Sequence, residues 1–382
     1  MKICTITCHD VYNHGASLQA YALMKYLLNC GHEVEIINYK PNYLSNHYNL
    51  FSVDNPKWEK NILIKYTYLA LKIPLRVPGL KRKKAFDKFT SNNLKLTSKK
   101  YETNSQLEED TPEADVFLCG SDQIWNCLHE NGKDPAFYLQ FVPSEKIKAS
   151  YAASFATDDI RNEYKPIVKE RVNNLDYISV RESSGVKLLE KMGIKDVVNV
   201  VDPAFLLNRN DWNNLAQTKL SERFLVVYDF EDSEIIKEIA LSISKLRKCK
   251  IYAIGSTKVS YAHKSFIYDG PDVFISLIRD ANFVISNSFH SIVFSIIFEK
   301  DFAIVNRKEA INTRMRDLLR ALNLEDRLIT NSFNEDLLNE SIDFDDCREI
   351  MANKIEVSKK FLQKVLDHEK GFNNAEESIV CN

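Results

Sequence analysis

The chain has 382 residues, of which 45% are hydrophobic and 27% are charged, and its 51 Lys and Arg nearly balance its 53 Asp and Glu. This length suits two domains of ordinary size, and this composition excludes a wholly disordered chain. A formal net charge of −2 provides no overall attraction to nucleic acid, so we expect no nucleic-acid partner, and any anionic ligand must be bound by a local basic cluster.

The first forty residues have the order strand, loop, helix, strand. KICTITC is a short apolar run, residues 17–31 carry apolar side chains at helical spacing up to Gly31, and HEVEIINY ends before Pro41. After an irregular region at 42–110, which contains a helical stretch, the alternation resumes. Strands are predicted at 114–120, 148–155, 176–182 and 196–202, and a helix at 183–193.

The second half repeats this alternation, beginning with the strand RFLVVYDF. Residues 203–222 are polar and irregular, so we place a domain boundary between residues 205 and 206. Residues 346–370 are predicted to form one long helix, which could pack back on the first domain. The order of elements predicts an α/β protein with two Rossmann-like domains, 1–205 and 206–382, that face a cleft.

Ligands of such folds bind beyond the carboxyl ends of the strands, where loops lead into helix N-termini. Asn13, His14 and Gly15 follow the first strand and either bind an anion or hydroxyl groups, or form an ordinary turn capped by Ser17. Another polar cluster follows the strand at 114–120 and is suited to hydrogen-bonding a polyol, although loops are polar in general. Its members are Ser121, Asp122, Gln123 and Asn126.

Charged side chains follow two further strands. Arg181 ends a buried strand and must pair with an anion, either a structural carboxylate such as Glu182 or a ligand phosphate or carboxylate. Asp202 ends the strand at 196–202 and is either a cap or a functional group.

The strand NFVIS leads into Asn287, Ser288, Phe289 and His290 at the start of a helix. A helix N-terminus lowers the pKa of a histidine, which suits a neutral proton donor or base near pH 7, and the alternative is a packed, hydrogen-bonded histidine. Three arginines further along could form the local cationic cluster, or lie on a solvated helix face. They are Arg307, Arg314 and Arg316.

Several well-known motifs are absent from the sequence. It contains no GxxxxGK[ST], no GxGxxG after the first strand, no HExxH and no GxSxG. P-loop ATP hydrolysis, NAD binding, zinc-peptidase action and α/β-hydrolase chemistry are therefore disfavoured. The eight cysteines include no CxxC pair, we identify no metal site, and MKICTITC has no signal-peptide pattern, so we expect a reduced, cytoplasmic protein.

Seven segments occur in order over residues 1–325 and resemble the polysaccharide pyruvyltransferase family: NHGASLQAYAL, GSDQIWN, YAASF, SVRESSGVKLL, VDPAFLL, SNSFHSIVFSIIFEKDFAIV and TRMRDLL. The resemblance implies a GT-B-like fold, with residues 1–205 on the acceptor side and 206–382 on the donor side. It implies transfer of pyruvate from phosphoenolpyruvate to a sugar of a cell-surface polysaccharide or its lipid-linked precursor. The product would be a ketal, phosphate would be released, and no cofactor would be needed.

The resemblance also implies roles for the candidate residues. His290 and Arg181 would be catalytic, and Asp122 or Asp202 could deprotonate the acceptor. The donor would be bound by Arg181, Asn287, Ser288, Phe289, His290, Arg307 and Arg314, and the acceptor by Asn13, His14, Gly15, Ser121, Asp122, Gln123 and Asn126. Ser288 stands where better-studied members have an arginine, so we expect Arg307 or Arg314 to replace that charge.

Two other functions fit the same fold: a GT-B-type glycosyltransferase that uses a nucleotide sugar, and a non-catalytic ligand-binding relative. Residues 62–84 suggest a further partner, because an amphipathic stretch is followed there by four consecutive basic residues. This segment could rest on an anionic membrane surface, or form a packed helix and a solvated charge run. The protein would then work at the inner face of the membrane.

Overall fold

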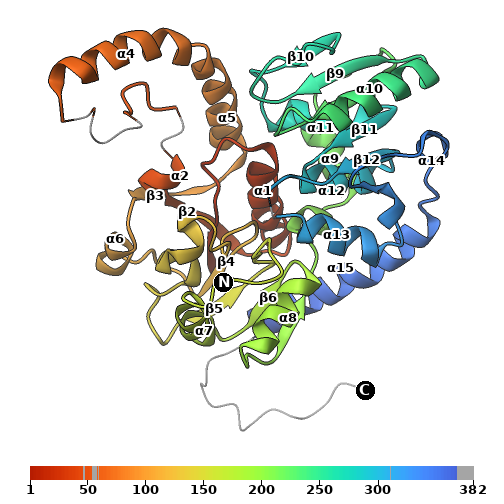
Figure 1. The fold of residues 1–382 in the computed structure, drawn as a ribbon. Helices are drawn as coiled ribbons and strands as arrows, with labels where there is room; N and C mark the ends of the chain where they lie inside the picture. The colour runs from red at the N-terminus through yellow and green to blue at the C-terminus, as the bar shows by residue number, and fades with distance from the viewer. Residues whose placement is uncertain (46–47, 54–57, 59, 310, 368–382) are drawn as a thin grey trace, which may run out of the picture.

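The structure is a computed structural model, and it describes residues 1–45, 48–53, 58, 60–309 and 311–367. Two parallel sheets with helices packed against them make up the fold (Figure 1). The first sheet comes from the N-terminal part of the chain and the second from the C-terminal part. This arrangement confirms the predicted α/β, GT-B-like fold class, while the domain boundary at 205/206 stays a prediction.

Five strands form the first sheet: β1 (Lys2–Ile6), β2 (Glu33–Tyr39), β3 (Leu96–Tyr101), β4 (Val116–Cys119) and β5 (Ile147–Ser150). Their order is β3-β2-β1-β4-β5, and all neighbours are parallel. The order reverses beside β1, where sheets of this type bind ligands. A parallel pair, β6 (Ile178–Val180) and β7 (Val197–Asn199), continues from β5 through isolated bridges.

The helices of this part are α1 (His14–Asn29), α2 (Asn42–Ser45), α4 (Ile62–Arg76), α5 (Gly79–Asn93), α6 (Asn104–Glu109), α7 (Lys165–Asn173) and α8 (Ser183–Lys191). The region at 42–110 is more regular than expected, because it holds β3, α5 and α6 in addition to the predicted helical stretch. The strand expected at 148–155 ends at Ser150.

Six parallel strands form the second sheet: β8 (Phe224–Tyr228), β9 (Lys250–Ile254), β10 (Lys264–Phe266), β11 (Phe283–Ser286), β12 (Phe302–Val305) and β13 (Leu328–Ile329). Their order is β10-β9-β8-β11-β12-β13. The helices are α9 (Arg209–Leu215), α10 (Glu234–Arg247), α11 (Pro271–Asp280), α12 (Phe289–Phe298), α13 (Thr313–Ala321), α14 (Glu335–Asn339) and α15 (Asp345–Leu366).

The stretch at 203–222 is not irregular throughout, because it contains α9. Asn208 and Asp211 form a capping box at the start of this helix, which stabilises it despite its polar composition. Trp212 of α9 is fully buried, and its indole Nε1 donates to the carbonyl of Ala204 at 3.1 Å. A single buried tryptophan thus anchors a segment that otherwise has the composition of a linker.

One hydrophobic core joins the two halves around α1. Leu18 of α1, Trp212 of α9 and Phe294 of α12 all belong to it. The ring of Tyr21 on α1 lies 5.8 Å from that of Trp212, which in turn lies 4.8 Å from that of Phe294. This packing brings the N-terminus of α1 against the second half of the molecule.

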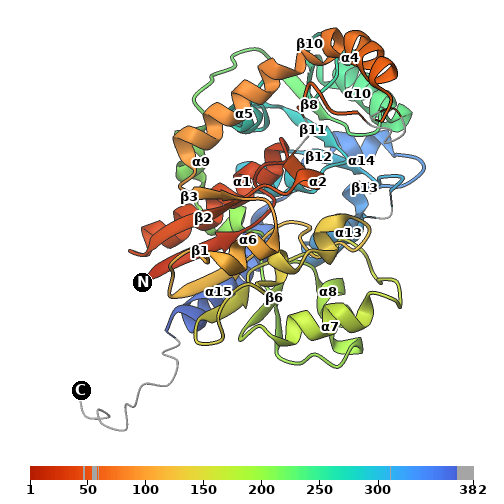
Figure 2. The same cartoon turned by 90° about the vertical axis from the view of Figure 1, so that its left-hand side faces the viewer.

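The C-terminal helix α15 returns to the first half, as the sequence suggested. The Oγ of Ser358 accepts a hydrogen bond from the backbone N–H of Val201 at 2.9 Å, and the ring of Phe361 lies 6.5 Å from that of Tyr151. Elsewhere, α13 lies beside α8 in both views (Figure 1, Figure 2), and Asp317 accepts a bond from the N–H of Ser184 at 2.8 Å. Within the described part of the chain, no helix is long and apolar enough to cross a membrane.

Candidate functional site

The loops that follow the strands of both sheets bring polar side chains together. Asn13 follows β1 and Asp122 follows β4, whereas Asn287 follows β11 and Arg307 follows β12. The carboxyl ends of parallel strands lie at one edge of a sheet, and here these edges of the two sheets face each other.

Between them lies a small cavity of about 50 Å³, which we call the central pocket. Most of its lining was predicted from the sequence, from both the proposed acceptor side and the proposed donor side. It is lined by Asn13, Asp122, Gln123, Phe230, Asn287, Ser288, Phe289, His290, Arg307, Arg314 and Met315.

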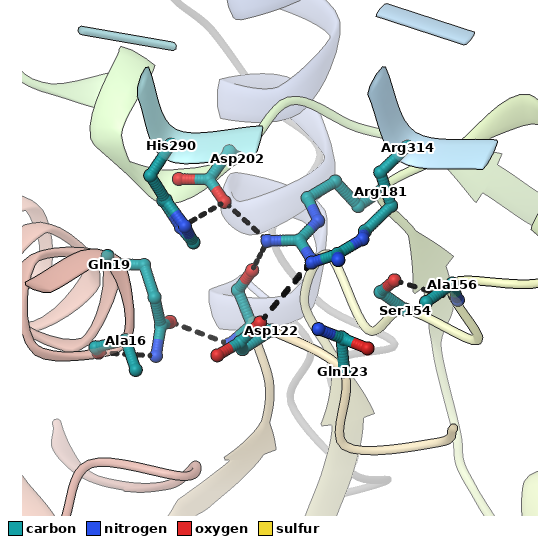
Figure 3. Close-up of polar contacts among 12 residues, drawn as sticks. Ala16, Gln19, Asp122, Gln123, Ser154, Ala156, Arg181, Asp202, His290 and Arg314 are labelled. Carbon is teal, nitrogen blue, oxygen red and sulfur yellow. Dashed lines mark hydrogen bonds and ion pairs between the residues drawn. The ribbon is translucent and has the colours of Figure 1, made fainter. Parts of the chain in front are cut away.

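Arg181 lies behind this pocket and is held by a carboxylate. Its NH1 donates to Oδ2 of Asp202 at 2.7 Å and to the Oγ of Ser121 at 3.4 Å, and its NH2 lies 3.6 Å from Oδ1 of Asp122 (Figure 3). The structural partner of Arg181 is therefore Asp202 and not Glu182, the carboxylate expected from the sequence. Oε1 of Glu182 accepts instead from the Oγ of Ser154 and from two backbone N–H groups.

Asp202 connects Arg181 to His290. Its Oδ2 lies 3.5 Å from Nε2 of His290, and its Oδ1 accepts from the N–H of Ala204 at 3.0 Å. Burial opposes ionisation of Asp202, but the neighbouring His290 and Arg181 outweigh it and hold the pKa of Asp202 well below its usual range. Asp202 therefore remains a carboxylate that fixes both neighbours, in addition to capping the turn that follows it.

Arg314 of α13 is a second buried arginine, and it lines the central pocket. Its NH1 lies 3.8 Å from Oδ1 of Asp122, and the side-chain oxygen of Gln123, turned toward it, accepts from both of its terminal nitrogens at 3.1 and 3.0 Å. Burial and the nearby charge of Arg181 lower the pKa of Arg314 to about 10. This cation is thus less well compensated than Arg181, which favours an anion beside it.

The ring of Phe289 lies against both guanidinium groups. Its centroid is 4.5 Å from the Cζ of Arg181 and 5.7 Å from that of Arg314. A flat aromatic face holds a guanidinium in one orientation without satisfying its N–H groups. Phe289 therefore positions the arginines and leaves their hydrogen-bond donors available.

Asn13, rather than Ser17, caps α1. Its Oδ1 accepts from the N–H of Gly15 at 2.9 Å and of Ala16 at 3.3 Å. Gly15 itself adjoins His290, because a Cβ at this position would lie 2.0 Å from Nδ1 of the histidine. The two residues thus form a close contact between the two halves.

His14, predicted to bind the acceptor, is placed among aromatic side chains instead of in the central pocket. Its ring stacks on that of Phe274 at 5.1 Å, and its Nε2 lies 3.3 Å from NH2 of Arg82. Burial, followed by the charge of Arg82, lowers the pKa of His14 well below its usual range. His14 is the first residue of α1, and its side chain is fully buried in the core.

Ser121 and Asn126 support the loop that carries Asp122 and Gln123. The N–H of Ser121 donates to Oε1 of Gln19 at 3.2 Å, and Oδ1 of Asn126 accepts from the N–H of Leu128 at 3.0 Å. Both residues are fully buried behind the central pocket.

The remaining predicted arginines differ in their surroundings. Arg307 lines the central pocket and pairs with Glu231 at 3.3 Å and Glu309 at 3.2 Å. Arg316 pairs with Asp158, through contacts of 2.8 and 2.6 Å, away from this pocket. Only Arg307 and Arg314 of the three arginines therefore reach the pocket.

Two pocket residues were not predicted, Phe230 and Met315. Phe230 comes two residues after β8, so the strand-end rule that found Asn13 and Asn287 would also have found it. Met315 has no such signal, because it lies inside a helix. Ser288 also lines this pocket, together with Arg314, one of the two arginines expected to replace the charge missing at position 288.

A larger groove of about 680 Å³, which we call the outer groove, opens from the central pocket. The two share Asn13, Asp122, Gln123 and Arg307, and the outer groove extends to Tyr43, Leu128, His129 and Asn131. Among the described residues, no group of three or more His, Cys, Asp and Glu side chains is arranged to hold a metal ion.

Comparison with known protein families identifies one family. A family model described as polysaccharide pyruvyl transferase matches residues 13–309. No curated protein matches the chain.

Solved structures with a similar fold include three at low identity. A putative UDP-N-acetylglucosamine 2-epimerase from Listeria monocytogenes is 12% identical, with 100% of this chain and 99% of that chain covered and a TM-score of 0.47. UDP-GlcNAc 2-epimerase from Neisseria meningitidis, bound to UDP-GlcNAc, is 12% identical, with coverage of 96% and 100% and a TM-score of 0.49. The spinosyn forosaminyltransferase SpnP is 11% identical, with coverage of 96% and 95% and a TM-score of 0.40.

Proposed function

Because the chain belongs to the polysaccharide pyruvyl transferase family, we propose that it transfers pyruvate from phosphoenolpyruvate to a sugar. The acceptor belongs to a cell-surface polysaccharide or its lipid-linked precursor, and the product is a ketal. The observation that carries this proposal is the pair of buried arginines, Arg181 and Arg314, beside His290.

Phosphoenolpyruvate carries a phosphate and a carboxylate, and guanidinium groups bind both through paired hydrogen bonds. Arg314 lines the central pocket, and its positive charge is less well compensated by neighbouring carboxylates than that of Arg181. We assign to Arg314 the charge that is missing at Ser288, and Arg307 lines the same pocket. The first N–H groups of α12 add donors for an anion.

The reaction begins with protonation of C3 of the enol by His290, which makes C2 oxocarbenium-like. A sugar hydroxyl then adds to C2, phosphate leaves, and a second hydroxyl closes the ketal. Phosphoenolpyruvate and two hydroxyls give one ketal and one phosphate, so the step balances without a redox cofactor. Asp202 is the positioning residue that holds His290 and Arg181.

Asp122 is better suited than Asp202 to accept the acceptor's proton. It lines both the central pocket and the outer groove, whereas Asp202 is fully buried and engaged by Arg181. The outer groove then holds the acceptor sugar, with Asn13 and Gln123 as hydrogen-bonding partners. We place the reaction in the cytoplasm, at the inner face of the membrane when the acceptor is lipid-linked.

A ligand titration followed by thermal unfolding tests the donor. A ligand at 100 times its Kd stabilises a protein by about 2.7 kcal/mol, which raises the melting temperature by a few degrees. We expect phosphoenolpyruvate to do so and UDP, GDP and CMP to have no effect. Stabilisation by a nucleotide diphosphate alone would show a nucleotide-sugar glycosyltransferase instead.

Phosphate release tests the chemistry separately from binding. With an acceptor polysaccharide present, His290→Ala is expected to abolish release of phosphate from phosphoenolpyruvate while the thermal stabilisation by this donor remains. Wild-type binding of the donor without any turnover, across a panel of acceptors, would identify a non-catalytic relative.

A further inference from the structure

Helix α4 presents apolar side chains to solvent. Leu63 is 77% exposed, Leu71 is 70% exposed and Leu75 is 74% exposed, and Leu69 is the one buried residue of this described helix. Figure 1 shows α4 at the outer edge of the molecule, joined to the body through α5. Soluble proteins rarely leave so many large apolar side chains exposed on one element, so such a surface indicates an interaction site.

Only a narrow part of the surface of α4 contacts the rest of the protein. Lys65, Leu69, Lys72 and Arg76 follow one another at intervals of three or four residues and therefore share one face. Leu69 and Arg76 of this face contact the protein, because Leu69 is buried and Arg76 donates to the carbonyl of Ser52 at 2.7 Å, whereas Lys72 is exposed beside the apolar side chains. The wide apolar face, which includes Ile62, Leu63, Tyr66, Leu71 and Leu75, is left outside.

The surrounding sequence is strongly basic. From residue 60 to residue 86 there is no Asp or Glu, whereas Lys and Arg recur throughout. The four basic residues at 81–84, however, are only partly available to a ligand. Arg82 is buried and donates to the carbonyl of Gly255 at 2.8 Å, and Lys83 pairs with Asp87 at 2.6 Å. The basic run thus partly serves the packing of α5, and the exposed apolar surface belongs to α4.

We propose that the apolar face of α4 docks on an anionic phospholipid bilayer, with the helix lying in the plane of the interface. Apolar side chains flanked by lysine and arginine, without acidic residues, are the pattern that binds such surfaces. A second copy of the chain is a poorer occupant, because a symmetric contact would bring the basic residues of both copies together. This docking goes beyond the proposed reaction, and its test requires no substrate.

Co-flotation of the full chain with vesicles tests the proposal. We expect binding to vesicles of phosphatidylcholine with phosphatidylglycerol and much weaker binding to phosphatidylcholine alone. The triple variant Leu63→Gln/Leu71→Gln/Leu75→Gln is expected to lose binding by about tenfold or more, since three exposed apolar anchors are removed. Glutamine retains the helix propensity of leucine, so the fold is expected to survive.

The matched control removes two exposed leucines from another helix, α10. Leu241 and Leu246 are 47% and 46% exposed, and the variant Leu241→Gln/Leu246→Gln is expected to bind vesicles like the wild type. Lys72→Glu should weaken binding to the anionic vesicles by about fivefold or more, because one basic residue near an anionic surface contributes roughly 1 kcal/mol to binding. It should not change binding to phosphatidylcholine vesicles.

Two results would overturn the proposal. One is a triple variant that floats with anionic vesicles as well as the wild type does. The other is a wild-type protein that binds neither vesicle type and elutes as a dimer, while the triple variant elutes as a monomer. In that case α4 would be an interface between two copies of the chain. Circular dichroism of each variant establishes that its fold is intact.

Discussion

Gly15 and His290 are in such close contact that no other residue type fits at position 15 without moving the histidine. A Cβ on Gly15 would lie 2.0 Å from Nδ1 and 2.2 Å from Cγ of His290. These residues belong to α1 and α12, which start at the carboxyl ends of β1 and β11. The glycine thus determines how closely one half of the molecule approaches the proposed proton donor of the other.

Gly15→Ala is therefore expected to displace His290 and to reduce phosphate release from phosphoenolpyruvate by about 10²–10⁴-fold, the range for loss of one acid–base group. Gly255→Ala is the matched control, since a Cβ there meets nothing within 4 Å. Steady-state release of phosphate measures both. Activity of Gly15→Ala close to that of the wild type would show that this contact does not set the position of His290 for the reaction.

Arg314→Gln is expected to weaken binding of phosphoenolpyruvate by about tenfold or more, because a charge-assisted hydrogen bond contributes roughly 1.5–3 kcal/mol. Arg316→Gln, on the same helix, is the control, since Arg316 pairs with Asp158 instead of lining the pocket. Isothermal titration of both variants measures the two affinities. Equal weakening in both variants would mean that the effect comes from α13 as a whole and not from the guanidinium in the pocket.

Asp202→Asn is expected to lower the free energy of unfolding at pH 7 by about 3–5 kcal/mol, because Arg181 is left buried without its counter-charge. The pKa of Asp202 is lowered in the folded protein, so its stabilising effect is full above the unfolded pKa of about 3.9 and declines as pH falls below that value. The difference in the free energy of unfolding between the variant and the wild type should therefore be about 1 kcal/mol smaller at pH 3 than at pH 7.

Urea unfolding at the two pH values measures this difference. A destabilisation that does not change with pH would contradict the assigned ionisation of Asp202. The activity of this variant adds a second readout, since a positioning role predicts an altered pH profile of phosphate release rather than a uniform loss.

The order of strands and helices, and most of the strand-end residues, could be predicted from the sequence. Apolar runs and helical spacing are local patterns, and parallel sheets gather the residues that follow their strands at one edge. This rule brought Asn13, Asp122 and Asn287 into one prediction. The helix α9 was not predicted from the sequence. The composition around Trp212 is polar and gives no sign that this one side chain is buried and anchors the helix.

The tertiary structure alone decided which partner each charged group has. Arg181 pairs with Asp202 across 21 residues, and Arg82 binds the carbonyl of Gly255 across 173 residues. His14 turns into the core although it follows a strand, whereas Arg314 reaches the central pocket from inside α13. The sequence by itself determined most of the secondary structure, the family and most of the candidate groups, because these depend on local patterns. The orientation and charge state of each group depend on burial and on contacts between distant segments, which exist only once the chain has folded.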